Sequence, residues 1–390
     1  MSKWEMVRLG DVCELTNGYA FDSVYFNTDG KGMPIIRIRD VVRGFTETYT
    51  VESCREEYVI KKGDLLIGMD GEFNIAPWNS DDALLNQRVC KIESSSAKLI
   101  NPYLYYYLPK ALKLIEEATS FVTVKHLSSK KINDISIPLP PLPVQQQIAD
   151  VLDRASALIE KRKAQIEMLD LLVKSRFIEM FGDLGAHNVR WPDSTIEELC
   201  KKKDDIKCGP FGTQLSKDEY KNEGVPLWGI PQINASFTMP PTDFLDDKKA
   251  SQLDSYSILP NDIVMSRKGN VGKCALYPQF GEKGIMHSDV LRIRIDCDKV
   301  SPVFLMHQLH YSNYVQQQIL VVSSGAIMAG INVTKLKTIR VHSPSLSLQT
   351  QFADFVHQVE SHKSLLKQSL IHLEQNYKSL MQKCFRGEIF

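Results

Sequence analysis

The sequence lacks the cysteine patterns of zinc sites and redox centres. Its eight cysteines are scattered along 390 residues, without a CxxC pair and without a Cys/His group at zinc-ligand spacing. Scattered cysteines of this kind are typical of reduced, structural thiols, so we expect a cytoplasmic protein.

Long apolar runs are also missing. The longest, residues 319–331, is interrupted by Ser323, Ser324 and Gly325, and it is too short to cross a bilayer. The first six residues contain no apolar segment like that of a signal peptide. We therefore expect no membrane partner.

Neither charge is in excess. The 47 Lys and Arg residues balance 47 Asp and Glu residues, and residues 1–143 hold 17 basic against 19 acidic side chains. A chain this neutral has no overall field that attracts a polyanion, so we expect weak binding to one unless partner chains help.

Two stretches come close to catalytic signatures and fail. Residues 101–103, Asn-Pro-Tyr, lack the second proline of the Asn-Pro-Pro-Tyr box of amino-methyltransferases and fit the start of a helix better. Residues 269–274 resemble the end of a P-loop, but Arg267 stands where the first glycine is needed and Cys274 replaces the Ser or Thr. A loop between two strands is the better interpretation of this second stretch.

Carboxylates and histidines offer no alternative site. His307 and His310 have helical spacing but no third ligand nearby, which favours a partly buried pair over a metal site. Three adjacent aspartate pairs are interpreted as solvated loop charges: Asp81-Asp82, Asp204-Asp205 and Asp246-Asp247. We expect no catalytic residue, no metal and no cofactor bound by this chain.

What the sequence does contain is one long helical pattern, present twice. Mostly apolar side chains recur in steps of four and three from residue 148 to 180, and again 204 positions later, which is the spacing of a coiled-coil seam. Each stretch of 33 residues predicts about 50 Å of helix. The apolar seam residues are Ile148, Leu152, Ile159, Ile166, Leu169, Val173, Phe352, Val356, Leu366, Leu370, Leu373 and Leu380.

The stretches before each helix repeat as well, with offsets that drift from 192 to 204. Each copy has a short helix after a tryptophan, a glycine turn, several strands, and a helix opened by a proline. The paired segments are strands at 32–40 and 224–232, hairpins at 58–67 and 256–265, strands at 87–92 and 288–293, helix starts at 101–104 and 301–304, and linkers at 135–145 and 339–349.

The repeat predicts an α+β fold with two similar strand-rich modules and two long helices that form an antiparallel coiled coil with pseudo-two-fold symmetry. We assign the first module to residues 1–143, the first helix to 144–182, the second module to 183–346 and the second helix to 347–390. Two similar modules joined by rigid spacers suit a bipartite target. Double-stranded DNA, with its fixed rise and near-dyad symmetry, rewards such an arrangement.

The double pattern resembles the DNA specificity subunit of type I restriction-modification systems over essentially the whole chain. The likeness rests on the tryptophan-plus-helix starts, the Gly-Pro-Phe-Gly turn at 209–212, the Gly63-Asp64 turn, and the Ile-Pro-Leu-Pro-Pro-Leu stretch at 137–142 before a Gln-led helix. The second linker departs from the pattern, because it lacks the counterparts of Pro138, Pro141 and Pro143.

The resemblance implies a non-catalytic subunit with two target recognition domains, each reading one half of an interrupted DNA sequence. It also implies that the long helices dock two modification subunits, which carry S-adenosylmethionine and the adenine methylation chemistry. Restriction subunits would then supply ATP- and Mg-dependent translocation and cleavage.

Candidate DNA contacts are the polar side chains at predicted strand ends, since Arg pairs with guanine and Asn or Gln with adenine. We favour the glycine-containing loop that starts at Arg267, because it is dense in donors. The candidates in the first module are Arg37, Arg39, Arg43, Asn86, Gln87, Arg88, Lys125 and His126; those in the second are Gln214, Gln232, Asn234, Arg267, Lys268, Asn270, Lys273 and His287.

Two other interpretations remain open at this point. The chain could be a region of a fused restriction-methylation enzyme, although no methylation or nuclease centre is found in it. It could also be a coiled-coil adaptor with two protein-binding modules and no role at DNA, which would have the same helices and differ only in the donor-rich loops.

Overall fold

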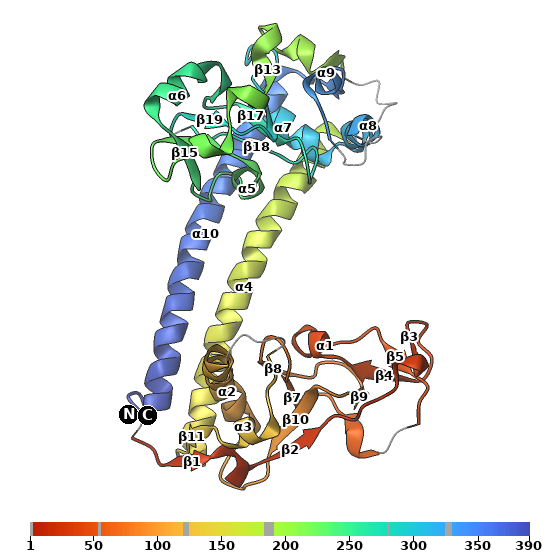
Figure 1. The fold of residues 1–390 in the computed structure, drawn as a ribbon, viewed down its shortest axis with the longest axis vertical. Helices are drawn as coiled ribbons and strands as arrows, with labels where there is room; N and C mark the ends of the chain where they lie inside the picture. The colour runs from red at the N-terminus through yellow and green to blue at the C-terminus, as the bar shows by residue number, and fades with distance from the viewer. Residues whose placement is uncertain (1–2, 54–55, 120–124, 183–190, 280, 324–329) are drawn as a thin grey trace. The chain divides into compact units, whose positions relative to one another are not determined.

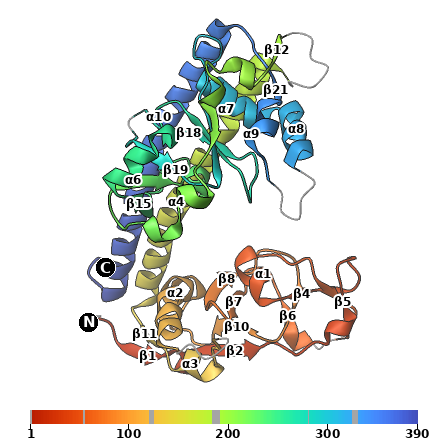
Figure 2. The same ribbon diagram turned by 45° about the horizontal axis from the view of Figure 1, so that its top comes forward.

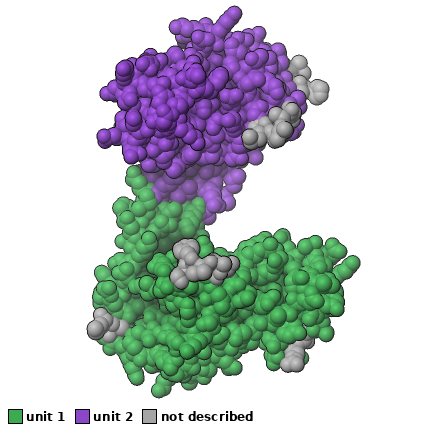
Figure 3. Space-filling view, viewed as in Figure 1, with its two compact units in different colours: residues 1–163, 368–390 green, residues 164–367 purple. Residues whose placement is uncertain are grey.

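The structure is a computed structural model that describes residues 3–53, 56–119, 125–182, 191–279, 281–323 and 330–390. The chain divides into two compact units, residues 1–163 with 368–390 (unit 1) and residues 164–367 (unit 2) (Figure 3). Each unit combines one strand-rich module with a segment of both long helices (Figure 1). The four domain boundaries given above stay predictions.

The two predicted long helices are present and continuous. They are α4 (Leu142–Phe181, 40 residues) and α10 (Leu346–Arg386, 41 residues). Helix α4 begins two residues earlier than predicted and contains Pro143 in its first turn, where a missing N–H breaks no helical hydrogen bond. The fully buried Gln145 locks this start, because its amide donates to the carbonyl of Pro140 at 2.8 Å.

Every residue of the predicted seam is buried or half-buried. In unit 1, Ile148 and Leu152 of α4 share a core with Cys384 of α10. In unit 2, Val173 of α4 shares a core with Phe352 of α10. The start of each helix therefore packs with the end of the other within each unit, which is the antiparallel arrangement that the repeat predicts.

The described residues of the unit 1 module form three sheets. The smallest pairs β1 with β11, which lie side by side in Figure 2. The largest core lies between the four-stranded sheet, α2 and the long helices. The sheets are, in order, β1 (Met6–Arg8) and β11 (Ser136–Pro138); β2 (Cys13–Asn17), β10 (Val89–Ser94), β7 (Leu65–Gly68) and β8 (Asn74–Pro77); and β3 (Phe26–Asn27), β5 (Tyr49–Thr50), β4 (Met33–Ile36), β9 (Ala83–Leu85) and β6 (Val59–Ile60). The helices are α1 (Ile38–Arg43), α2 (Asn101–Ala118) and α3 (Ser129–Asn133).

Unit 2 repeats this plan, with parallel pairing of β14 and β19 matching that of β4 and β9. Its sheets are β12 (Asp193–Thr195) and β21 (Arg340–His342); β13 (Ile206–Cys208), β20 (Val290–Ile293), β17 (Ile263–Ser266) and β18 (Cys274–Leu276); and β15 (Asp243–Leu245), β14 (Val225–Trp228), β19 (Gly284–Met286) and β16 (Ser257–Ile258). Its helices are α5 (Ile230–Asn234), α6 (Asp247–Gln252), α7 (Pro302–Tyr311), α8 (Asn313–Ser323) and α9 (Val333–Lys337).

The predicted hairpins at the Gly63-Asp64 and Asn261-Asp262 turns are wrong. Strand β6 pairs with β9, whereas β7 pairs with β8 and β10, so the first turn carries the chain from one sheet to the next. Unit 2 does the same with β16 and β17. In both turns the aspartate accepts the backbone N–H three residues earlier, and the preceding residue has positive φ (96° and 70°).

The strands predicted over 32–40 and 224–232 end early and continue as helices. Strand β4 ends at Ile36 and β14 at Trp228, after which α1 and α5 begin. In α1 the buried Asp40 carboxylate accepts the Arg37 N–H at 3.0 Å, which satisfies one of the unpaired donors of a helix start. The alternation of apolar residues concealed this capping interaction.

The short helices predicted after the two tryptophans are only single 3-10 turns, Leu9–Asp11 and Glu197–Leu199. A strand, β2 or β13, follows each of them. The remaining 3-10 turns are Ser23–Tyr25, Glu56–Tyr58, Lys203–Asp205, Gly212–Gln214, Lys217–Glu219 and Asp254–Tyr256.

The two proline-opened helices are confirmed, but their register differs from the predicted one. Ser301 caps α7, as expected, and its backbone N–H donates to the side chain of Gln349 at 2.8 Å. In unit 1 the corresponding N–H is that of Ile100, which donates to Gln145 at 3.1 Å. Ile100 therefore corresponds to Ser301, so equivalent residues of α2 and α7 are 201 positions apart. The prolines do not align, because Pro102 is the second residue of α2 whereas Pro302 is the first residue of α7.

The interpretation of the aspartate pairs as solvated loop charges is wrong for Asp205. Its side chain is only 9% exposed and accepts the backbone N–H groups of Lys201 and Lys202 at 3.1 and 2.8 Å. Among the described residues, no helix is long and apolar enough to cross a membrane.

Substitution of a seam residue should destabilise the chain far more than substitution of its neighbour. Val173→Asp buries a carboxylate in the core of unit 2, so we expect a loss of roughly 3 kcal/mol or more in the free energy of unfolding. Leu172→Asp, at a position that is 45% exposed, should change it by less than about 0.5 kcal/mol. Urea denaturation measures the free energy of unfolding of both variants. Equal losses would contradict the burial of Val173 in the seam.

Acid should weaken unit 2 through His307. Burial lowers the pKa of this histidine from 6.5 to about 4, although its ring nitrogen is paired with the Val303 carbonyl at 2.8 Å. Below pH 6.5 the unfolded chain takes up a proton that the folded chain refuses, so the free energy of unfolding falls as the pH drops towards 4. We expect the variant His307→Asn to lose part of this slope in urea titrations, whereas His362→Asn, at an exposed position of α10, should keep it.

Candidate nucleic-acid interface

The favoured polar residues lie where three segments meet at the ends of strands in each module. In unit 1 the chain after β7, the chain before β10 and the segment at 125–127 lie side by side. Met69 donates its N–H to the carbonyl of Arg88 at 2.9 Å, and Leu127 donates to Met69 at 2.7 Å. Backbone hydrogen bonds therefore fix the side chains that these segments carry.

Three ionisable side chains meet at this place in unit 1: Asp70, Arg88 and His126. The Arg88 Nε lies 3.4 Å from Asp70 Oδ2, and the His126 Nδ1 lies 2.6 Å from Asp70 Oδ1 and 3.1 Å from Arg88 Nη1. A single ring nitrogen cannot both donate to Asp70 and accept from Arg88, and the shorter contact favours donation to the carboxylate. Asp70 thus holds two donor side chains, each about half exposed, in one place.

Arg88 also has an unusual backbone. Its φ is +70°, in the left-handed region that costs a non-glycine residue about 1 kcal/mol or more. The conformation directs the guanidinium from the turn before β10 towards Asp70. Strain of this kind persists where the surrounding structure holds it, and it is concentrated at functional sites.

The same three segments meet in unit 2. Arg267 donates its N–H to the carbonyl of Asp289 at 2.9 Å, and Ile331 donates to Arg267 at 3.2 Å. The ammonium of Lys268 lies 2.8 Å from Asp289 Oδ1. His287 accepts the N–H of Asp289 on Nδ1 at 3.2 Å, so the remaining proton of a neutral ring sits on Nε2.

The two clusters carry the same ion pair with its charges exchanged. The shared backbone hydrogen bonds align Asp70 with Lys268, and Arg88 with Asp289. In unit 1 the acid follows β7 and the cation precedes β10; in unit 2 the cation follows β17 and the acid precedes β20. Both modules thus have an ion pair at these two positions, whereas the position and the chemical type of the cation differ.

The loop that starts at Arg267 is confirmed as a connection between two strands, β17 and β18. Ser266 donates its N–H to the carbonyl of Lys273 at 2.7 Å, and Gly269 and Gly272 have φ of +68° and +85°. A Cβ atom at residue 272 would lie 2.8 Å from the side chain of Ile319. Both this close approach and the positive φ therefore require a glycine at this position. The loop exposes the side chains of Lys268 and Lys273.

A family model described as the type I restriction modification DNA specificity domain matches residues 1–168 and 188–375. The chain belongs to this family of specificity subunits. Each of the two matched segments contains one strand-end cluster: Asp70, Arg88 and His126 in the first, and Lys268, His287 and Asp289 in the second. The two matches together account for the internal repeat. The family assignment favours DNA recognition over the non-DNA adaptor and over the fused enzyme.

Relatives of known name agree with the assignment. The chain is 31% identical to the EcoBI specificity subunit of Escherichia coli, with 99% of this chain and 86% of the relative covered. It is 22% identical to the MjaVIII specificity subunit of Methanocaldococcus jannaschii, with 99% and 93% covered. Both relatives are named as specificity subunits of type I restriction enzymes.

Two solved structures share the fold of the specificity subunit. The S subunit of a type I system from M. genitalium aligns with a TM-score of 0.59 at 15% identity, and covers 98% of this chain and 96% of its own. A chain from a structure of complex assembly in a type I R-M system gives a TM-score of 0.59 at 17% identity, with 99% and 98% covered.

The structure separates the predicted contact residues into two groups. The residues that lie in the strand-end segments or in the loop between β17 and β18 are Asn86, Gln87, Arg88, Lys125, His126, Arg267, Lys268, Asn270, Lys273 and His287. The residues that lie elsewhere are Arg37, Arg39 and Arg43 on or beside α1, Gln214 in a 3-10 turn, and Gln232 and Asn234 on α5.

Some candidates serve the fold instead. Gln232 is only 2% exposed, and its amide accepts from the Gly229 N–H and donates to the Pro240 carbonyl, both at 3.1 Å. Asn86 is 8% exposed and caps the turn before β10. We therefore withdraw Gln232 and Asn86 as contacts to bases.

Two further candidates neutralise buried acids. The ammonium of Lys125 lies 3.9 Å from the buried Glu116, and Arg43 lies 3.5 Å from the buried Asp40. Each acid also has a second cation nearby, Lys113 at 3.2 Å from Glu116 and Arg39 at 3.7 Å from Asp40. Lys125 and Arg43 therefore contribute to the pairing of these acids, and as contacts to DNA they stay predictions.

The sequence analysis missed Asp70 and Asp289, which orient the exposed cations. A signal for them was present in the repeat itself. Aligning the modules places Asp70 opposite Lys268 and Arg88 opposite Asp289, so both positions reverse charge together. Two compensating reversals within one chain are a sign of spatial contact.

Proposed function

We propose that this specificity subunit reads a bipartite DNA target, with one domain for each half-site and with the strand-end clusters at the bases. The observation that carries the proposal is the ion pair that recurs in both domains with its charges exchanged. DNA recognition needs donors held in place, and a carboxylate beside each cation reduces its freedom without burying it.

The exchange also means that the two half-sites differ. A guanidinium donates in a bidentate manner to O6 and N7 of guanine, whereas an ammonium is a single point of charge without that fork. Arg88 and Lys268 approach from different strand ends, so they would reach different positions along their half-sites. We therefore expect an asymmetric target, such as two unlike base sequences on either side of unspecified bases.

Modification subunits would dock through the long helices. In unit 2, Met168, Leu171 and Leu172 stand at i, i+3 and i+4 on α4, and their side chains are 63%, 55% and 45% exposed. An exposed apolar stripe on a helix is suited to a partner helix. The equivalent positions of α10, 204 residues later, are His372, Gln375 and Asn376. Because these three residues are polar, α10 has no apolar stripe at the positions equivalent to those of α4.

The chemistry would belong to the partners. We propose that S-adenosylmethionine and adenine methylation reside on the modification subunits, and that ATP and Mg act on restriction subunits. Among the described residues of this chain, no three His, Cys, Asp or Glu side chains are grouped as metal ligands. The charge balance also favours DNA binding with the help of partner subunits, because this chain carries equal numbers of basic and acidic side chains.

Arg88→Ala should relax recognition of one base in one half-site. We expect the complex to lose about 1–3 kcal/mol of discrimination at that position, with the other half-site unchanged. Sequencing of methylated adenines in cells that express the variant with its own modification subunit measures both halves at once. Lys62→Ala, at an exposed position away from the cluster, is the control. An unchanged motif, or equal loss in both halves, would contradict the assignment.

Leu171→Asp should weaken assembly with the modification subunit without unfolding the chain. The side chain is exposed, so we expect the free energy of unfolding to change by less than about 0.5 kcal/mol. Gln375→Asp, at the equivalent position of α10, is the matched control and should assemble normally. Co-purification of the two subunits measures the effect, and equal assembly of both variants would exclude this stripe as the docking surface.

A further inference from the structure

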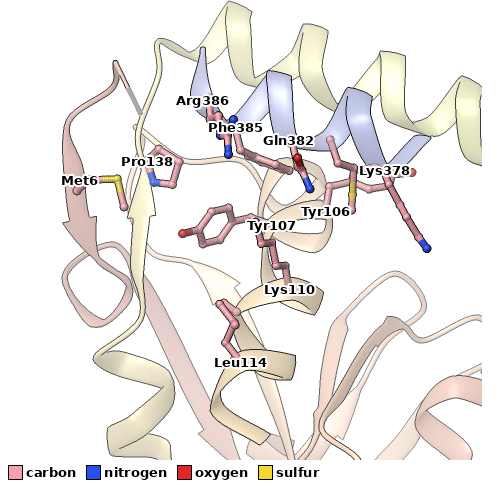
Figure 4. A pocket seen from close by; sticks show the side chains of 12 residues that line it. Met6, Tyr106, Tyr107, Lys110, Leu114, Pro138, Lys378, Gln382, Phe385 and Arg386 are labelled. Atoms are coloured by element: carbon pink, nitrogen blue, oxygen red, sulfur yellow. The ribbon is translucent and has the colours of Figure 1, made fainter. Parts of the chain in front are cut away.

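A pocket of about 470 Å³ lies in unit 1 between α2, the last turns of α10, and the β1–β11 pair. Figure 4 shows Tyr107, Lys110 and Leu114 entering it from α2, and Lys378, Phe385 and Arg386 from α10. The volume is within the range of about 300–1,000 Å³ found for ligand pockets. None of the candidate DNA contacts lines the pocket.

Aromatic rings form the apolar wall of the pocket. Phe385 packs edge-on against Tyr107 at a centroid distance of 5.2 Å, and both are half-buried. The Tyr107 hydroxyl already donates to the carbonyl of Ser136 at 2.6 Å, so its ring, not its hydroxyl, is what an occupant would meet. Leu114, which is 58% exposed, extends the apolar surface to the rim.

The charged side chains of the lining have one sign. Lys110, Lys378 and Arg386 line the pocket, and no carboxylate does. Arg386 lies 3.5 Å from Glu388, whereas the exposed Lys110 and Lys378 form no ion pair with any residue that the structure describes. An apolar floor with uncompensated cations at its edge attracts an apolar group that carries negative charge beside it.

The repeat explains why the pocket is open. Using the offsets of 201 for α2 and 204 for the long helices, Lys110 corresponds to Tyr311, and Met381 in the pocket wall corresponds to Phe177. In unit 2 those two aromatic rings contact each other at a centroid distance of 5.7 Å. Where unit 2 places two rings against each other, unit 1 has a lysine and a flexible methionine beside a cavity.

We propose that this pocket binds a short acidic peptide segment of another protein, with one large apolar side chain inserted against Phe385 and carboxylates paired with Lys110 and Lys378. Charge complementarity selects this occupant, because a basic or neutral segment would leave the cations unpaired. A buried anchor surrounded by polar contacts is the usual arrangement of an interface hot spot. The proposal is independent of which bases the two domains read.

The test uses the full chain and a fluorescein-labelled hexapeptide with leucine and phenylalanine at its centre and two glutamates on each side. We expect saturable binding by fluorescence anisotropy that weakens as salt is raised. Peptides with lysines in place of the glutamates, or serines in place of the central pair, should bind at least tenfold more weakly. Absence of binding up to about 1 mM, or equal binding of the three peptides, overturns the proposal.

Variants connect the binding to the pocket. Lys378→Glu, at an exposed position, should weaken binding of the acidic peptide at least tenfold, whereas Lys62→Glu elsewhere in unit 1 should leave the affinity unchanged. The double variant Lys110→Tyr with Met381→Phe introduces the rings of unit 2 and should abolish binding while the chain stays folded by circular dichroism. Equal affinity of Lys378→Glu and Lys62→Glu overturns the proposal. So does sedimentation that shows a dimer of this chain dissolved by the double variant, since the occupant is then a second copy.

Discussion

Antiparallel packing of the two long helices is the constraint on which the rest of the structure depends. Neither helix can bury its seam alone, and each unit contains the start of one helix and the end of the other. The modules add to the same cores, since Phe304 of α7 and Tyr103 of α2 pack with the seam residues of their units. A duplicated chain that satisfies this packing therefore obtains two similar modules, each built on a helix pair.

Duplication preserved interactions and altered the groups that make them. The glutamines at the two helix starts, Gln145 and Gln349, are both fully buried and share two hydrogen bonds: each accepts the N–H at the start of a shorter helix and donates to a proline carbonyl. An unpaired amide in the core would destabilise each module. At the strand ends the ion pair persisted, but its charges were exchanged between Asp70–Arg88 and Lys268–Asp289. The cations are about half exposed and their acids are partly exposed, so these positions could differ in chemistry without loss of the fold. Recognition of different half-sites requires that freedom.

The two units also differ where partners would meet them. The apolar stripe of α4 has polar counterparts on α10, and the pocket of unit 1 has aromatic counterparts in unit 2. A pseudo-symmetric subunit with unequal surfaces can distinguish partners that a symmetric one would treat alike. The same core packing thus supports unlike surfaces, because the seam determines which residues are buried and leaves the opposite faces free to vary.

The sequence by itself determined the helices, the repeat and the family, because a seam of steps of four and three is a local periodic signal that 33 residues express twice. Only the tertiary structure decided which turns join separate sheets and which polar residues serve the fold. Gly63-Asp64 has the composition of a hairpin turn, yet the strands on its two sides do not pair with each other: β6 pairs with β9, and β7 pairs with β8 and β10. Gln232 and Arg88 have the same predicted role, and burial in one and exposure beside Asp70 in the other separate them. Strand partners and burial depend on contacts between distant residues, which local sequence does not specify.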